Sequence, residues 1–201
     1  MISPISQFKQ NIERVRNIHS IYNILNIKTT GVIDVSDVLR AELVLVVSAF
    51  DYYVHEVVRQ GMLEVFQGKR VETPSFRNFT VSLECVREAI SNHSTFDWLE
   101  NEIISRNSWK SFQQAEKVSE AIRLISDIDL WVEIASKLGK NYKDLKTRLN
   151  LIVDRRNKIA HEADMDPSYP GIRWPIDEIM TEEAINFIEE IVETMDEILK
   201  I

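Results

Sequence analysis

Apolar side chains recur at steps of three and four residues along most of the chain, and this spacing predicts amphipathic α-helices. The first such pattern includes Phe8, Ile12, Val15 and Tyr22 and predicts a helix over about residues 6–26. His19 lies on the same apolar seam. A hydrogen-bonded histidine in the core or at an interface is the favoured interpretation of that position.

A longer pattern predicts the central helix of the molecule, over about residues 36–67. Between Leu39 and Val58 this segment is apolar on nearly every side, which is typical of a helix that is buried all round. Gly31 and the capping candidates Asp34 and Ser36 predict a break in the chain before it.

The rest of the chain predicts further helices separated by short breaks. Gly139 is suited to end one helix, and Asn141 is suited to cap the next, over about residues 142–163. We therefore predict an all-α fold, a helical bundle built around the helices at about 36–67 and about 142–163. The other expected helices cover about residues 80–91, 95–125 with a break near Asn107 and Ser108, 127–138, and Thr181 to the end, and the segments 68–75 and 166–175 are expected to be irregular.

Length and composition indicate one domain over residues 1–201, because the chain has only five glycines and five prolines and no linker-like stretch. The single cysteine, Cys85, excludes an internal disulfide framework and is typical of a reducing cytoplasm. No basic segment followed by an apolar run opens the sequence, and the longest apolar run, 43–50, is far too short to span a bilayer. We expect a cytoplasmic protein that is not membrane-bound.

The charge is unevenly distributed. A net charge of −8 argues against a protein that coats nucleic acid non-specifically. Between Lys137 and Lys158, however, basic residues far outnumber the acidic Asp144 and Asp154. This run is either a solvated helix face or a surface that faces phosphate groups.

The basic run ends in the segment Arg155-Arg156-Asn157-Lys158-Ile159-Ala160-His161-Glu162. It places a permanent cation, Arg156, close to His161, the side chain best suited to proton transfer near neutral pH. On an ideal helix these two side chains point about 140° apart, at roughly 100° per residue. Three arrangements could bring them together: a distorted helix, an arginine that reaches around it, or a second copy of the chain.

The central helix carries a matching group of polar residues, since Arg40, Ser48, Asp51 and His55 fall on one side of it. For Asp51 we favour a supporting role, holding Arg156 or orienting His161. For His55 a hydrogen-bonded core position and a direct role in a site stay equally open.

The chain resembles the HEPN superfamily and its RiboL-PSP branch in the polar group on the central helix, in residues 155–162 and in the late Trp174-Pro175-Ile176. The resemblance covers residue 36 to the end. It implies a helical bundle that forms a homodimer, with two Arg-x4-His elements facing each other across a cleft. It further implies a metal-independent endoribonuclease, typically in toxin–antitoxin or anti-phage systems, with an antitoxin or defence partner. By position Arg156 and His161 would be the catalytic pair, and Asn157 the polar residue that follows the arginine.

In that interpretation His161 acts as general acid or base while an RNA 2′-hydroxyl attacks the adjacent phosphate, and Arg156 stabilises the charge on the phosphoryl oxygens. Arg155 and Lys158 would hold the RNA backbone, and Asp51, His55 and Arg40 would support the site. No cofactor or metal is expected, because no phosphate-binding glycine loop or metal-ligand spacing is present. The alternative is a non-catalytic helical module that binds nucleotides or proteins, with Arg156 as a buried cation paired to Asp51.

Overall fold

A computed structural model describes residues 2–29, 33–92 and 95–200. In these ranges the protein is all helical, and the only β-type pairing is an isolated bridge between Met165 and Arg173. Among the same residues no helix is both long and apolar enough to cross a membrane. The helices are α1 (Pro4–Thr29), α2 (Ser36–Phe66), α3 (Pro74–Arg77), α4 (Leu83–Ser91), α5 (Asp97–Asn107), α6 (Ala115–Ile122), α7 (Leu130–Leu138), α8 (Tyr142–Glu162) and α9 (Glu178–Leu199).

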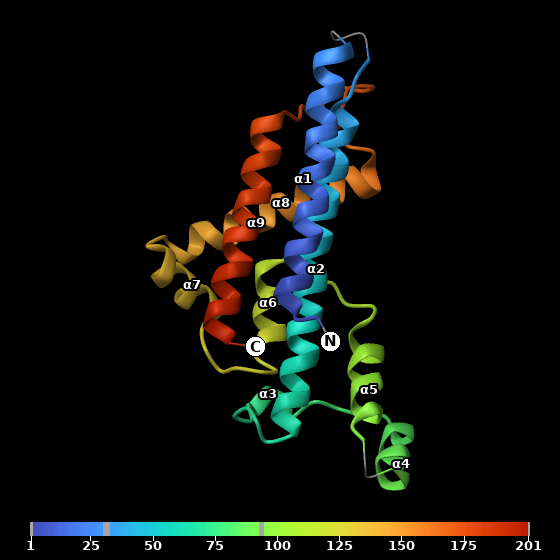
Figure 1. The fold of residues 1–201 in the computed structure, drawn as a ribbon, viewed down its shortest axis with the longest axis vertical. Helices are drawn as coiled ribbons and strands as arrows, with labels where there is room; N and C mark the ends of the chain where they lie inside the picture. Colours follow the sequence, from blue (N-terminus) through green and yellow to red (C-terminus); the bar gives the residue numbers. More distant parts are fainter. Residues whose placement is uncertain (1, 30–32, 93–94, 201) are drawn as a thin grey trace.

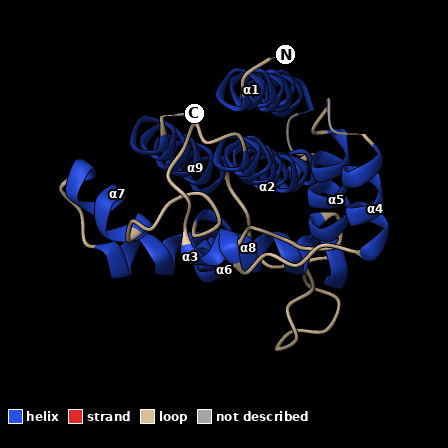
Figure 2. Ribbon diagram, turned by 90° about the horizontal axis from the view of Figure 1, so that it is seen from below, coloured by secondary structure: helices blue, strands red, loops and turns tan. Residues whose placement is uncertain are grey.

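The long helix α2 is the centre of the bundle, as predicted. It packs against α1, α9, α8, α5 and α6, and α1 runs along α2 except for the last turns of α2, which extend beyond the start of α1 toward α3 (Figure 1). Seen along the helices, α1, α2 and α9 lie next to one another, while α6 and α8 cover the other side of α2 (Figure 2). Side chains of α2 that are completely buried include Val46, Phe50, Tyr53 and Val57. Burial of this apolar surface is the main source of stability.

His19 joins three helices within this bundle. Its Nδ1 lies 2.9 Å from the fully buried Glu42 of α2, and its Nε2 lies 3.2 Å from Glu178 of α9. Burial works to lower the pKa of His19, but the hydrogen bonds and negative charges of the two glutamates outweigh burial and raise this pKa. Burial raises the pKa of Glu42 against the opposing effect of His19. The expectation of a hydrogen-bonded histidine at this position is confirmed.

Several of the expected boundaries differ from those in the structure, including the starts of α4 and α7, which lie about three residues later than expected. A short helix, α3, forms over residues 74–77, of which 74 and 75 were expected to be irregular, because the hydroxyl of Thr73 accepts from the backbone N–H of Phe76 and caps a helical turn. The last helix begins at Glu178 instead of Thr181, since Asp177 accepts from the N–H of Met180. The break near Asn107 is much longer than expected: residues 108–114 are not helical and separate α5 from α6. Gly31 lies outside the described residues.

The helix α8 has both ends where the sequence predicts them, within a residue. Asn141 caps its start by accepting from the N–H of Lys143 at 2.8 Å. Its end is formed by Ala163 and Asp164, which adopt the left-handed conformation with φ of 52° and 59°. The carbonyl of Asp164 then accepts from the N–H of Trp174 at 2.9 Å. The residues that follow α8 are therefore tied back against its last turn.

Candidate functional site

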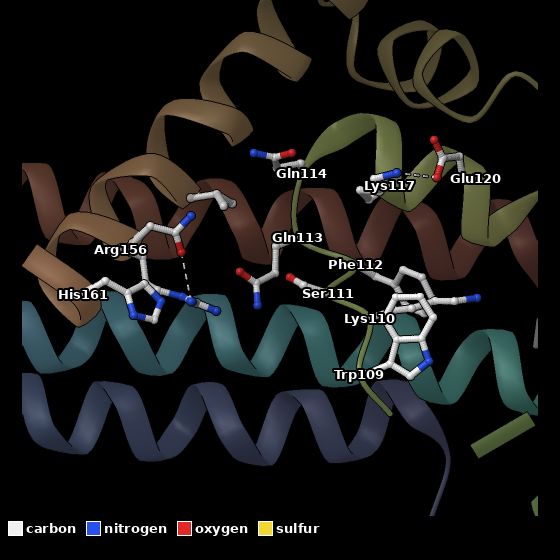
Figure 3. Close-up of a pocket in the computed structure, with 12 residues that line it drawn as sticks. Trp109, Lys110, Ser111, Phe112, Gln113, Gln114, Lys117, Glu120, Arg156 and His161 are labelled. Carbon is white, nitrogen blue, oxygen red and sulfur yellow. Dashed lines mark hydrogen bonds and ion pairs between the residues drawn. The ribbon is translucent and has the colours of Figure 1, made fainter. Parts of the chain in front are cut away.

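An open cavity of about 660 Å³ lies between α8 and the segment that links α5 to α6. From α8 the cavity receives the side chains of Arg156, Asn157 and His161, and Figure 3 shows Arg156 and His161 next to each other on one side. A cavity of this size is typical of sites for small organic ligands or part of a polymer. Its other lining residues are Trp109, Lys110, Ser111, Phe112, Gln113, Gln114, Lys117, Glu120 and Val153.

Arg156 is half-buried, and its guanidinium is only partly hydrogen-bonded. Its Nη1 donates to Oδ1 of Asn157 at 3.0 Å, whereas its buried Nε has no hydrogen-bond partner. A buried donor without a partner is costly in a folded protein. Arg156 is therefore a cation at the cavity wall whose guanidinium is not fully hydrogen-bonded within the protein.

His161 lies in the last turn of α8 and is exposed at the same cavity. Helix α8 runs without interruption through both Arg156 and His161, so no distortion of the helix is needed for both to line one cavity. The long arginine side chain covers the angular separation that an ideal helix imposes. An exposed imidazole beside a cation is suited to acid–base chemistry on an anionic substrate.

Asp51 has partners other than the expected ones. Its carboxylate accepts from the N–H of Phe112 at 2.6 Å and from Nε2 of Gln113 at 3.0 Å. The expectation that Asp51 holds Arg156 or orients His161 was therefore wrong. Asp51 instead fixes the segment opposite α8, and Asn150 assists by accepting from the N–H of Ala115 at 2.9 Å.

His55 supports the same segment. Its ring centroid lies 4.5 Å from that of Phe112, and its Nε2 lies 3.8 Å from Oδ1 of Asp51. His55 is half-buried and is not among the residues that line the cavity. The structure thus places it behind the cavity wall, in contact with the residues that form that wall.

Arg40 and Arg155 form a separate cluster around the buried carboxylate of Asp164. Arg40 Nε donates to Asp164 Oδ2 at 2.7 Å, and Arg155 Nη2 donates to the same oxygen at 2.9 Å. Both arginines also donate to the carbonyl of Trp174. Burial lowers the pKa of Arg155; the charge of Asp164 opposes this effect and the charge of Arg40 adds to it. This cluster anchors the residues immediately after His161.

The residues expected to hold RNA are not brought to the cavity. Arg155 is engaged in the cluster just described, and Lys158 places its ammonium 5.2 Å from the ring centroid of Trp174. Neither lines the cavity with Arg156 and His161. Consecutive side chains on a helix point in different directions, so Arg155 and Lys158 lie on a different face of α8 from Arg156.

Sequence reasoning missed the segment 109–114, which forms the wall opposite α8 (Figure 3). The only local signal is the interruption of the helical pattern near Asn107, followed by Trp109 and the polar residues up to Gln114. Its proximity to α8 depends on contacts with Asp51, sixty-one residues away from Phe112. No pattern of local spacing reports such a contact.

Within the described part of the chain, no group of three or more His, Cys, Asp or Glu residues is arranged to hold a metal ion. A family model described as RiboL-PSP-HEPN matches residues 9–200. The chain belongs to this family. No curated protein and no solved structure matches the chain significantly.

Membership of the RiboL-PSP-HEPN family fits a nuclease-type module, and it fits the all-α architecture. The match includes the residues that line the cavity and the cluster around Asp164. In this RiboL-PSP-HEPN protein the cavity contains Arg156 and His161, and the cluster anchors the end of the helix that carries them.

Proposed function

We propose that the protein is a metal-independent endoribonuclease that cleaves RNA to a 2′,3′-cyclic phosphate and a 5′-hydroxyl. The observation that carries this proposal is that Arg156, Asn157 and His161 line the same open cavity. A permanent cation and an imidazole at one cavity supply the two functions that transesterification at phosphorus requires, charge stabilisation and proton transfer.

In the proposed reaction the 2′-hydroxyl of the substrate loses its proton to the imidazole of His161, and the 2′-oxygen forms a bond to phosphorus. The bond between phosphorus and the 5′-oxygen breaks, and that oxygen takes up a proton. Arg156 donates to the non-bridging oxygens as their charge increases, with a two-pronged contact as the strongest form. Asn157, which accepts from Arg156, orients the guanidinium.

A second copy of the chain would supply the second proton-transfer group. We propose that the protein acts as a homodimer with a composite site, in which one His161 accepts a proton and the other donates one. The exposure of His161 supports this arrangement, because its imidazole is accessible from outside the protomer. We further propose that residues 1–201 act as one domain in the cytoplasm, as a toxin or anti-phage effector with a cognate antitoxin or defence partner.

The alternative, a non-catalytic module, requires Arg156 to be a buried cation paired to Asp51. That pairing is absent, since Asp51 accepts from Phe112 and Gln113. Arg156 is half-buried at a cavity instead of enclosed in an ion pair. These contacts favour the ribonuclease.

The test compares wild-type protein with His161→Ala and Arg156→Ala on a mixed RNA pool in EDTA, with the new ends mapped. Loss of a general acid–base group costs about 10²–10⁴-fold in rate, so we expect His161→Ala to abolish detectable cleavage. The matched control is Glu162→Ala, which changes the neighbouring exposed residue outside the cavity and should cleave like wild type. Equal cleavage by His161→Ala, or cleavage at a 2′-deoxy sugar, would refute the proposal.

A further inference from the structure

Trp109 is an unusually exposed tryptophan. Its relative accessibility is 78%, whereas Trp131 is 2% exposed and lies in the core. Large aromatic side chains are usually packed, because leaving one in water forfeits the stabilisation of burying it. Trp109 therefore contributes little to the fold of the protomer, and its position at the cavity calls for another explanation.

Trp109 lines the same cavity as Arg156 and His161, on the other side of it (Figure 3). Its neighbour Lys110 places its ammonium 5.7 Å from the ring centroid of Trp109 and donates to Asn107 Oδ1 at 3.0 Å. An aromatic face and a cation thus lie together at one side of the cavity. Arg156 provides the cation at the other side.

The backbone that carries Trp109 is held in place. The N–H of Lys110 donates to the carbonyl of Asn107 at 2.9 Å, and the N–H of Phe112 donates to Asp51. Trp109 thus lies within a turn closed by Asn107 and Lys110, in a segment that is tied to α2 at Phe112. A ring with few packing contacts on an anchored backbone is suited to bind a flat ligand, because little backbone ordering is needed on binding.

The cavity is also lined by neutral hydrogen-bonding side chains, those of the exposed Ser111 and Gln114 and that of the buried Gln113, whose Nε2 donates to Asp51. Its acidic residue, Glu120, is paired with Lys117 at 2.8 Å. Unpaired nucleic-acid bases are bound by this combination, with an aromatic face for stacking, amides for the base edges and cations for the phosphates.

We propose that Trp109 is a stacking platform for an unpaired base of the RNA strand whose phosphate lies at Arg156. Lys110 contacts the backbone of the same strand. The inference rests on the proposed function for the identity of the strand, and it adds that the site selects single-stranded over duplex RNA. In a duplex the bases are stacked on one another and leave no free face for the indole.

The experiment measures binding and not cleavage. Variants are made in the His161→Ala background so that the RNA stays intact, and binding of a fluorescently labelled single-stranded RNA of mixed sequence is followed by anisotropy. Trp109→Ala should weaken binding by roughly 5- to 150-fold, the usual range for loss of one base–aromatic stack. Trp109→Phe, which keeps a smaller ring, should lose less.

The matched control is Tyr169→Ala, which removes an aromatic side chain of 61% exposure that does not line the cavity. It should bind single-stranded RNA like the parent. A labelled RNA duplex should bind Trp109→Ala and the parent equally well. Circular dichroism should give the same melting temperature for Trp109→Ala as for the parent, as expected for a side chain that is mostly exposed.

Unchanged affinity of Trp109→Ala for single-stranded RNA would overturn the platform, as would an equal loss for single-stranded and duplex RNA. The two proposals fail separately. If the wild type cleaves RNA and Trp109→Ala does not change binding, only the stacking role of Trp109 is refuted. Binding that depends on Trp109, in a protein that cleaves no RNA, supports the platform and removes only the ribonuclease.

Discussion

Replacing Asp164 by asparagine tests whether the charge cluster after α8 holds the fold together. Asp164 is completely buried and accepts from Arg40 at 2.7 Å and from Arg155 at 2.9 Å. Asparagine keeps the size of the side chain, and it tolerates the left-handed backbone at this position, where φ is 59°. The substitution therefore removes the negative charge with little other change.

The expected loss in the free energy of unfolding depends on the hydrogen bonds that the two arginines keep. Removing one partner of a buried ion pair costs about 3–5 kcal/mol, because the other charge is left without compensation. Arg40 would keep its bonds to the hydroxyl of Ser36 and the carbonyl of Trp174, and Arg155 would keep two backbone carbonyls. These remaining acceptors place the expected loss at the low end, at about 3 kcal/mol.

Urea unfolding followed by far-ultraviolet circular dichroism measures the loss. Asp164→Asn should lower the midpoint at an unchanged m-value, since the surface exposed on unfolding stays the same. Asp154→Asn is the matched control: it removes an exposed carboxylate of α8 and should change the free energy of unfolding by less than about 0.5 kcal/mol. A loss below about 1 kcal/mol for Asp164→Asn would show that the fold does not depend on this charge.

Three further outcomes are expected. Asp51→Ala should destabilise the protein by about 1–3 kcal/mol in urea unfolding, because the buried N–H of Phe112 loses its acceptor, and it should also reduce cleavage; an unchanged midpoint would contradict this reasoning. Protonated His19 stabilises the fold below its ordinary pKa of 6.5, and this contribution is lost as the pH rises through the raised folded value. Melting temperatures should therefore fall above pH 6.5 in the wild type and fall less in His19→Gln, whereas equal slopes would argue against the linkage. Gly61→Ala should be destabilising despite its better helix propensity, because the new methyl would lie 2.8 Å from Ile125; combined with Ile125→Ala, it should cost less than the sum of the two single losses.

The sequence by itself predicted most of the helices and singled out the two residues that we propose as the reactive pair. The pattern around Leu39–Val58 predicted the buried central helix, and Asn141 predicted the start of the helix that carries Arg156 and His161. These are local properties: helical periodicity and capping depend on residues within a few positions of one another. The resemblance to the HEPN superfamily rested on the same short segments and is confirmed by the family match.

Only the tertiary structure decided which polar groups meet. Asp51 was expected to contact Arg156 but accepts from the N–H of Phe112. Arg155 was expected to hold RNA but donates to Asp164. The wall that carries Trp109 was not predicted at all. A side chain's partner is set by how separate helices pack, and a long cation finds whichever carboxylate the packing brings within reach. Periodicity along one helix gives the direction of a side chain, whereas the fold of the whole chain decides what lies in that direction.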